Sequence, residues 1–158
     1  MVDDDLASVE REIRISAPAN VIFGHLVDPS RMVRWLGRGV ELEPRPGGIF
    51  RVDVNGRDVV RGTVVELVPN RRLVVTWGWE GGGDRVPPGT TTVVIALEPD
   101  GEGTIVRLSH RNLRGRDREV HAYGWQHYLG RLAVAAAGGD PGPDALATTD
   151  IVHGLEMP

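Results

Sequence analysis

The chain has 158 residues, of which 18 are basic and 22 acidic, and its net charge of -4 argues against nucleic acid, because phosphate binding needs clustered positive charge. It contains neither cysteine nor lysine, which excludes thiol nucleophiles, disulfides, thiolate metal ligands and Schiff-base chemistry through a lysine amine. The length fits one domain.

One strand and two short helices are predicted at the start of the chain. Inner and outer side chains alternate over residues 9–15, which is the period of a half-buried strand. Ala17-Pro18 then favours the start of a short helix that continues through Leu26. Asp28-Pro29 has the pattern of an N-cap followed by a first-turn proline, so a second short helix is expected over residues 30–36.

From residue 40 the apolar period changes to two, which indicates a series of antiparallel strands. Asn55-Gly56 is the strongest hairpin signal, because both residues tolerate positive φ. Further turns are expected at residues 44–48, at Pro69-Asn70 and at residues 99–103. The predicted strands of this series cover residues 40–43, 50–54, 59–67, 73–80, 91–97 and 104–110.

The predicted strand at residues 73–80 carries two large aromatic side chains. Trp77 and Trp79 fall on the same face as Leu73 and Val75. Residues 81–89, rich in glycine and proline, follow and are expected to form a mobile loop at the end of the sheet.

A single long helix is predicted over residues 117–137. Trp125, Leu129, Leu132 and Ala136 recur on one helical face, which also carries His121 and Tyr128. A lone amphipathic helix after antiparallel strands buries such a stripe on the concave side of the sheet, so it is expected to form a pocket wall. We therefore expect one domain at residues 1–137, followed by a linker-like or loosely docked tail at residues 138–158.

Several local strings occur in a characteristic order over residues 9–137. They are Ser16-Ala17-Pro18, Asp28-Pro29 leading to Trp35, Gly47-Gly48-Ile49-Phe50-Arg51, GTVVELVP at 62–69, RLVVTW at 72–77, Leu108-Ser109-His110, and Gly124-Trp125 followed by Leu129 and Leu132. In this order they resemble the activator-of-Hsp90-ATPase-homologue (AHSA1-like) group of the START/Bet v 1-like (SRPBCC) superfamily.

The resemblance implies an α+β helix-grip fold. In that fold a curved antiparallel sheet of about six to seven strands wraps around a long C-terminal helix, two short helices follow the first strand, and a cavity lies between sheet and helix. Members of the superfamily bind lipids, hormones or polyketide-like molecules, some catalyse cyclisation or hydrolysis, and the eukaryotic namesakes stimulate a chaperone. Fold alone does not choose among these functions.

The candidate ligand-binding residues are the aromatic and polar side chains on the expected inner faces. The alternative for the aromatic residues is ordinary core packing, and for the histidines a hydrogen bond to the backbone or to the facing helix. Trp79 lies nearest the glycine-rich loop and is the expected mouth residue. The candidates are Trp35, Phe50, Trp77, Trp79, His110, His121, Trp125 and Tyr128.

Three functions remain open at this point. The leading hypothesis is binding of a small hydrophobic or aromatic ligand in the cavity. The second is an enzyme, a cyclase, dehydratase or hydrolase, with His110, His121 or Tyr128 as acid/base. The third is a protein-interaction or co-chaperone-like module that uses the outer helix face, with Tyr123 and Val134, and includes a homodimer.

No metal or cofactor motif stands out. His121 and His127 lie on opposite helix faces, and the chain has no His-Glu-x-x-His string, phosphate loop or Gly-x-Ser-x-Gly elbow. We therefore expect no metal and no cofactor. Residues 1–6 lack the basic and apolar regions of a signal peptide, and no apolar run is long enough to span a bilayer, so the expected location is cytoplasmic.

Overall fold

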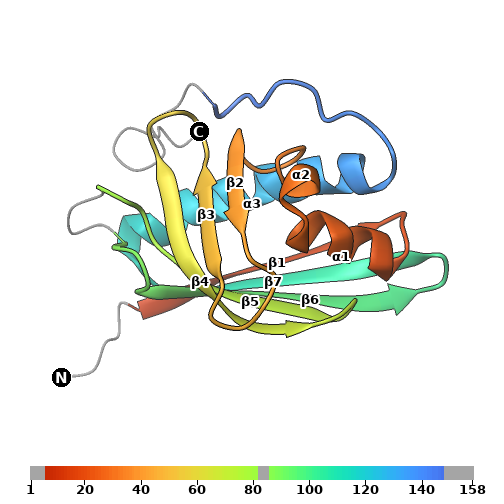
Figure 1. The fold of residues 1–158 in the computed structure, drawn as a ribbon, viewed down its shortest axis with the longest axis horizontal. Helices are drawn as coiled ribbons and strands as arrows, with labels where there is room; N and C mark the ends of the chain where they lie inside the picture. The colour runs from red at the N-terminus through yellow and green to blue at the C-terminus, as the bar shows by residue number, and fades with distance from the viewer. Residues whose placement is uncertain (1–5, 82–85, 148–158) are drawn as a thin grey trace.

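The computed structural model describes residues 6–81 and 86–147, which form an antiparallel sheet and three helices (Figure 1). No helix in these two ranges is long and apolar enough to cross a membrane. In chain order the elements are β1 (Leu6–Ile15), α1 (Ala19–Val27), α2 (Pro29–Met32), β2 (Gly39–Leu42), β3 (Ile49–Asp53), β4 (Val59–Val68), β5 (Arg72–Trp77), β6 (Thr91–Asp100), β7 (Gly103–Arg114) and α3 (Gly115–Ala136).

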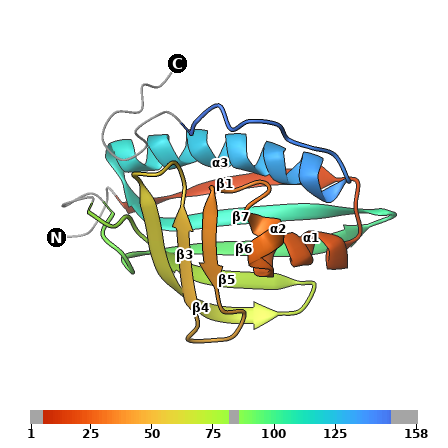
Figure 2. The same cartoon turned by 45° about the horizontal axis from the view of Figure 1, so that its top comes forward.

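The seven strands form one sheet in the order β1-β7-β6-β5-β4-β3-β2, and every neighbouring pair is antiparallel. The sheet curls around α3, and α1 and α2 lie beside one end of it (Figure 2). The predicted helix-grip architecture is therefore confirmed.

The hydrophobic core lies between the concave face of the sheet and α3. Alternate residues of β5, β6 and β7 point inward, as their period of two predicts, and they are buried from Leu73 to Trp77, from Thr91 to Leu97 and from Thr104 to His110. In the sheet register Trp77 pairs with Thr91, and Val93 pairs with His110. This pairing brings the polar residues Thr91 and His110 next to the tryptophan strand, directly under the helix.

The chain leaves β5 earlier than the sequence predicts. β5 ends at Trp77, and Trp79 continues only as an isolated bridge to Val60. Gly78 permits this path of the chain, because a Cβ on it would meet the carbonyl oxygen of Pro87 at 2.0 Å. The backbone N–H of Trp79 donates instead to Val86 at 2.8 Å, which holds the indole of Trp79 over the core.

The turn predicted at residues 99–103 is shorter in the structure. β6 continues through Asp100 and β7 begins at Gly103. Pro99 is tolerated within the strand because the pairing of β6 with β5 stops at Ala96, so no neighbouring strand needs the missing N–H.

The second helix is also shorter than residues 30–36. Asp28 caps it as predicted, with Oδ1 accepting from the backbone N–H of Ser30 at 3.0 Å, but α2 ends at Met32. A turn then leads to Gly37, whose φ of 79° and close approach to Val52 redirect the chain into β2.

Candidate functional site

A small cavity lies between the end of β5 and the first half of α3, with a volume of about 30 Å³. That is room for a water molecule, whereas pockets for drug-sized ligands measure ~300 Å³ or more. Ten residues line it. Five are predicted site residues, namely Trp77, Trp79, His121, Trp125 and Tyr128, and five are not, namely Leu36, Val54, Val120, Gly124 and Leu146.

Trp77 is the centre of an aromatic cluster that fills most of this space. Its ring centroid lies 5.1 Å from that of Trp125, and it meets Trp79 edge to face at 5.8 Å. Phe50 packs on it at 6.1 Å. Tilted and T-shaped pairs at these distances are favourable, so the rings stabilise the core in addition to walling the cavity.

His110 is held in a chain of hydrogen bonds beneath this cluster. Trp125 Nε1 donates to His110 Nδ1 at 3.0 Å, so His110 carries its proton on Nε2. His110 Nε2 then donates to Thr91 Oγ1 at 2.8 Å. Thr91 Oγ1 in turn donates to the carbonyl oxygen of Trp77 at 2.8 Å. Both imidazole nitrogens are thus used in the neutral ring.

His121 has a matching arrangement on the helix side. Trp79 Nε1 donates to His121 Nε2 at 3.0 Å, and His121 Nδ1 donates to the carbonyl oxygen of Asp117 at 2.6 Å. The two imidazole rings meet edge to face at 4.9 Å between centroids. Burial, followed by the neighbouring His121, lowers the pKa of His110 well below its ordinary value.

These bonds bear on acid/base chemistry at the site. A general base needs a ring nitrogen that can reach substrate, yet both nitrogens of each histidine are already engaged. Tyr128 donates its hydroxyl to Asp144 at 2.6 Å, and burial, together with that carboxylate, raises its pKa further above neutrality. In this arrangement neither His110 nor His121 presents an open ring nitrogen to a substrate.

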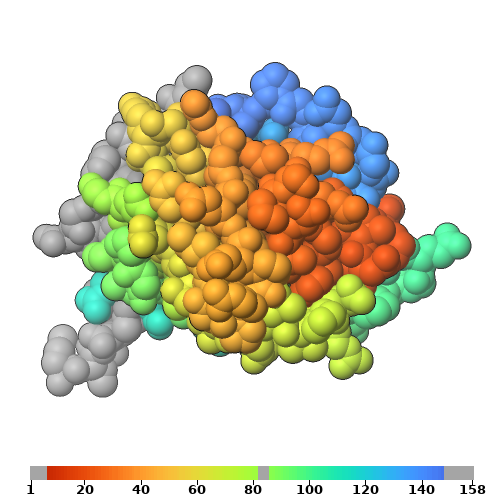
Figure 3. Space-filling model, viewed as in Figure 1, coloured from red at the N-terminus to blue at the C-terminus, as the bar shows by residue number. Residues whose placement is uncertain are grey.

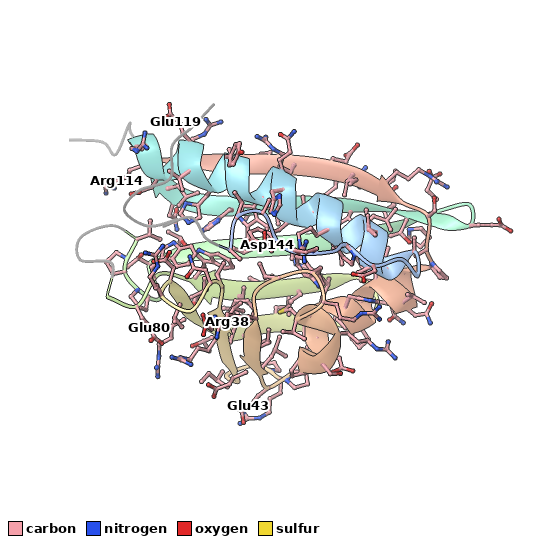
Figure 4. All side chains as sticks on the ribbon, turned by 90° about the horizontal axis from the view of Figure 1, so that it is seen from above. Arg38, Glu43, Glu80, Arg114, Glu119 and Asp144 are labelled. Atoms are coloured by element: carbon pink, nitrogen blue, oxygen red, sulfur yellow. The ribbon has the colours of Figure 1, made fainter. Side chains whose placement is uncertain are left out.

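The segment after α3 doubles back along the helix, as Figures 1 and 2 both show, and contributes one residue, Leu146, to the lining of the cavity. Its anchor is Asp144, which accepts from Tyr128 and is 2.7 Å from Nε2 of His127 (Figure 4). Burial alone raises the pKa of Asp144, but the hydrogen bonds from Tyr128, the Leu146 N–H and His127 outweigh it, so the pKa is lowered. Two residues beyond Asp144, Leu146 enters the cavity.

Arg131 is the second anchor of this segment. Its Nη1 donates to the carbonyl oxygens of Gly142 at 3.0 Å and Pro143 at 3.3 Å, and its Nε donates to that of Trp35 at 3.2 Å. One guanidinium thus joins α3, the turn after α2 and the returning segment. Figure 3 shows this side of the molecule covered by α1, α2 and β2, with the returning segment along its upper edge.

Three predicted site residues do not line the cavity. Trp35 packs between α1 and α2 and donates its indole N–H to the carbonyl oxygen of His25 at 2.8 Å. Phe50 lies behind the ring of Trp77. His110 is completely buried, one layer below the cavity. These three side chains therefore affect the cavity indirectly, by supporting the residues that form its wall.

Sequence reasoning missed five lining residues, and Val120 and Leu146 are the two most informative of them. Val120 lies outside the predicted inner stripe of α3 but is buried, because the cavity-lining residues of α3 follow an i, i+1, i+4, i+5, i+8 pattern that is wider than that stripe. Leu146 is the one leucine in the described part of the tail, residues 138–147. This isolated apolar residue was the sequence signal that could have indicated a contact with the core. Val134 is 42% exposed, and a homodimer through it and Tyr123 stays a prediction.

Apart from the contact of His127 with Asp144, the ion pairs in the described ranges lie away from the cavity, mostly on the sheet. Arg51 donates to Glu80 at 2.9 Å and to Glu41 at 3.2 Å, across neighbouring segments. Within residues 6–81 and 86–147, no group of three or more histidine, aspartate or glutamate side chains is arranged to hold a metal ion.

Comparison with known proteins places this geometry in a family. The family described as Activator of Hsp90 ATPase homolog 1-like protein matches residues 16–137, and the chain belongs to it. No curated protein matches.

Three solved structures illustrate the similarity. The AHSA1-like protein of Rhizobium etli is 39% identical with a TM-score of 0.71, and the match covers 97% of this chain and 92% of that one. CalU16 of Micromonospora echinospora is 26% identical with a TM-score of 0.69, covering 84% and 78%. DynU16, a protein in the dynemicin biosynthetic locus, is 26% identical with a TM-score of 0.74, covering 87% of this chain and 49% of that one.

Proposed function

We propose that this member of the AHSA1-like family binds a small, largely apolar molecule with an aromatic ring, held between the tryptophans of the sheet and α3. The observation that carries the proposal is a cavity walled by Trp77, Trp79 and Trp125 and lined on one side by Leu146, which comes from the segment after α3. Large aromatic walls with a few fixed polar groups are typical of small-molecule sites.

The chemistry of the wall determines the class of ligand. The lining is mainly indole rings and aliphatic side chains. His121, which also lines the cavity, and His110, which lies behind it, are neutral and already hydrogen bonded. A charged ligand would lose its hydration without gaining a partner. A planar apolar ring instead gains stacking contacts worth about 0.5–1.5 kcal/mol per aromatic pair.

The present cavity is too small for such a ring, so binding requires an opening. The cheapest opening is to displace the segment at residues 138–147, because it is held mainly through Asp144 and Arg131 rather than by the continuous packing that holds α3. Its departure removes Leu146 and uncovers the space beside Trp79 and Tyr128.

DynU16 lends this proposal further support. That relative is a protein in the dynemicin biosynthetic locus, and it shares the fold at 26% identity. A container for a small apolar molecule, in place of an enzyme with a free acid/base group, is also what the engaged histidines favour.

The test is a binding titration with indane as the probe, followed by intrinsic tryptophan fluorescence and calorimetry. Leu146→Ala is the opened variant, and Val65→Ala, at a side chain 52% exposed on β4, is the matched control. We expect saturable binding to the unaltered protein, tighter binding to Leu146→Ala and no change in Val65→Ala. Absence of binding to both the unaltered protein and Leu146→Ala would refute the proposal.

A further inference from the structure

Two glycines lie in the interior of α3 rather than at its ends. They are Gly124 and Gly130, and the helix runs from Gly115 to Ala136. A glycine inside a helix costs free energy relative to alanine, because the unfolded chain has more backbone freedom to lose there. Gly124 lines the cavity between β5 and α3, whereas Gly130 is not among the described residues of its lining. The missing side chain at Gly124 therefore needs a physical reason.

Packing does not supply that reason. A glycine is required where a neighbouring segment comes so close that a Cβ would collide with it, and Gly78, which faces the carbonyl oxygen of Pro87, is such a case. At Gly124 no heavy atom of residues 6–81 and 86–147 comes within 4 Å of the Cβ position, apart from its two chain neighbours and the nearby backbone of α3. The space for a side chain is thus empty in the described structure.

The empty space lies on the side of α3 that faces the cavity. At about 100° per residue, Gly124 falls midway between Val120, one turn before it, and Tyr128, one turn after it. Both of these side chains line the cavity. A Cβ at Gly124 would point in the direction that they bracket, so its absence leaves a gap between them in the helical wall. We call this gap the Gly124 notch.

We propose that Gly124 is a specificity-determining residue of the cavity, and that the flat face of an aromatic ligand lies in the Gly124 notch against the backbone of α3. This inference rests on the proposed function. Glycine is the residue that permits such a close approach of the backbone to a ligand. The contact rests on van der Waals attraction, so it requires no hydrogen bond from the ligand.

The notch also selects the shape of the ligand. It is only as deep as one missing methyl group, and an aromatic ring is a single layer of atoms that can enter it. A saturated ring system is puckered, and its hydrogens project above and below the mean plane of the ring, so it cannot approach the backbone as closely. The site should therefore prefer indane to hydrindane, which is the fully saturated form of the same carbon skeleton.

The experiment replaces Gly124 and Gly130 by alanine, one at a time, in the unaltered protein and in the Leu146→Ala background. Gly130→Ala is the matched control, because Gly130 is also half-buried, also has no described atom within 4 Å of its Cβ position, and falls outside the cavity-facing sector of α3. Both replacements remove an interior helical glycine, so each should raise the melting temperature by about 2–4 °C.

The two variants should differ in binding. Indane should bind Gly124→Ala about tenfold more weakly than the unaltered protein, because the new methyl group occupies the place of the ring. Its affinity for Gly130→Ala should be unchanged. Hydrindane should bind the unaltered protein several-fold more weakly than indane does, and the affinities of the two probes should become similar in Gly124→Ala.

A spectroscopic readout does not depend on any variant. One Hα of Gly124 takes the direction of the missing side chain, so the ring current of bound indane should shift this proton upfield and leave the Hα signals of Gly130 in place. Unmoved Gly124 signals in the indane complex, or an indane affinity of Gly124→Ala equal to that of the unaltered protein or of Gly130→Ala, overturns the inference and leaves the proposed function standing.

Two further outcomes also count against the inference. A lower melting temperature in Gly124→Ala alone would assign the glycine to packing and overturn its role in ligand choice. If indane binds neither the unaltered protein nor Leu146→Ala, the proposed function fails, and the inference fails with it.

Discussion

Trp125 on α3 donates its indole N–H to Nδ1 of His110 on β7 at 3.0 Å, and the opposite arrangement occurs nearby, where Trp79 after β5 donates to His121 on α3 at 3.0 Å. Each hydrogen bond thus joins a tryptophan to a histidine between α3 and the sheet side of the core. In the first bond α3 supplies the tryptophan, and in the second it supplies the histidine. Each bond needs a neutral imidazole that accepts at the nitrogen facing the indole. The attachment of α3 to the sheet therefore depends on the protonation state of these histidines.

The stability of the fold should fall as the pH drops below about 6.5, the ordinary pKa of a histidine. The folded state holds the pKa of His110 well below that value, through burial and then the neighbouring His121. The unfolded chain therefore binds a proton on His110 that the native state rejects, so stability is present above about pH 6.5 and is lost below it. One such group contributes a slope of about 1.4 kcal/mol per pH unit. Urea unfolding at pH 5.0, 6.0, 7.0 and 8.0 measures it.

The control for this pH dependence is His110→Gln, because the glutamine side chain at residue 110 does not titrate in this pH range. Its unfolding free energy is expected to be lower at pH 8 but flatter between pH 5 and 6.5. An equally steep slope in His110→Gln would assign the pH dependence to other groups and contradict the assignment to His110.

Trp77→Phe should destabilise the protein less than Trp125→Phe. Both indoles are 4% exposed and lose the same volume, so the cavity cost is comparable. Trp125→Phe also leaves Nδ1 of His110 as a buried acceptor without its donor, whereas Trp77→Phe removes a donor that has no partner in the described structure. The difference should be about 1–3 kcal/mol. Thermal and urea unfolding at pH 8 measure it, and a larger loss in Trp77→Phe would show that its N–H is satisfied after all.

Asp144→Asn should loosen the segment at residues 138–147. The carboxylate accepts from Tyr128 and contacts His127, and an amide in its place turns one acceptor into a donor that faces the Tyr128 hydroxyl. Amide hydrogen exchange in this segment should accelerate, while exchange in β5 and β6 stays slow. Asp140→Asn is the matched control, because Asp140 is exposed and bonds only within its own turn. Equal exchange in the two variants would count against Asp144 as the anchor.

Much of the fold follows from periodicity in the sequence. The alternation that ends at His110 and the alternation over residues 73–80 place His110 and Trp77 on the inner face, and the structure buries both. The glycine-rich stretch and the first-turn proline at residue 29 also mark real boundaries. These signals are local, because they need only the twofold or 3.6-fold period of one element.

The site was less predictable because its contacts join residues that are distant in the chain. Trp79 and His121 are 42 residues apart, so no local pattern indicates that the histidine accepts a hydrogen bond from the indole. Leu146 enters the cavity only because Asp144 two residues earlier binds Tyr128 on α3. Tertiary packing brings such partners together, and no short window of the sequence indicates which residues will meet.

Arg131→Lys should open the cavity although the charge is kept. The guanidinium reaches the carbonyl oxygens of Gly142 and Trp35 at once, and a lysine ammonium is a single point charge that cannot span both. We expect a loss of about 1–2 kcal/mol in unfolding free energy and faster amide exchange at residues 138–147. Association of indane should also be faster, because a larger fraction of the protein is already open before the ligand arrives. Arg14→Lys is the control, since Arg14 forms an exposed pair with Asp100. Stopped-flow fluorescence gives the association rate. An unchanged rate in Arg131→Lys, alongside faster exchange in the segment, would show that the ligand enters by another route.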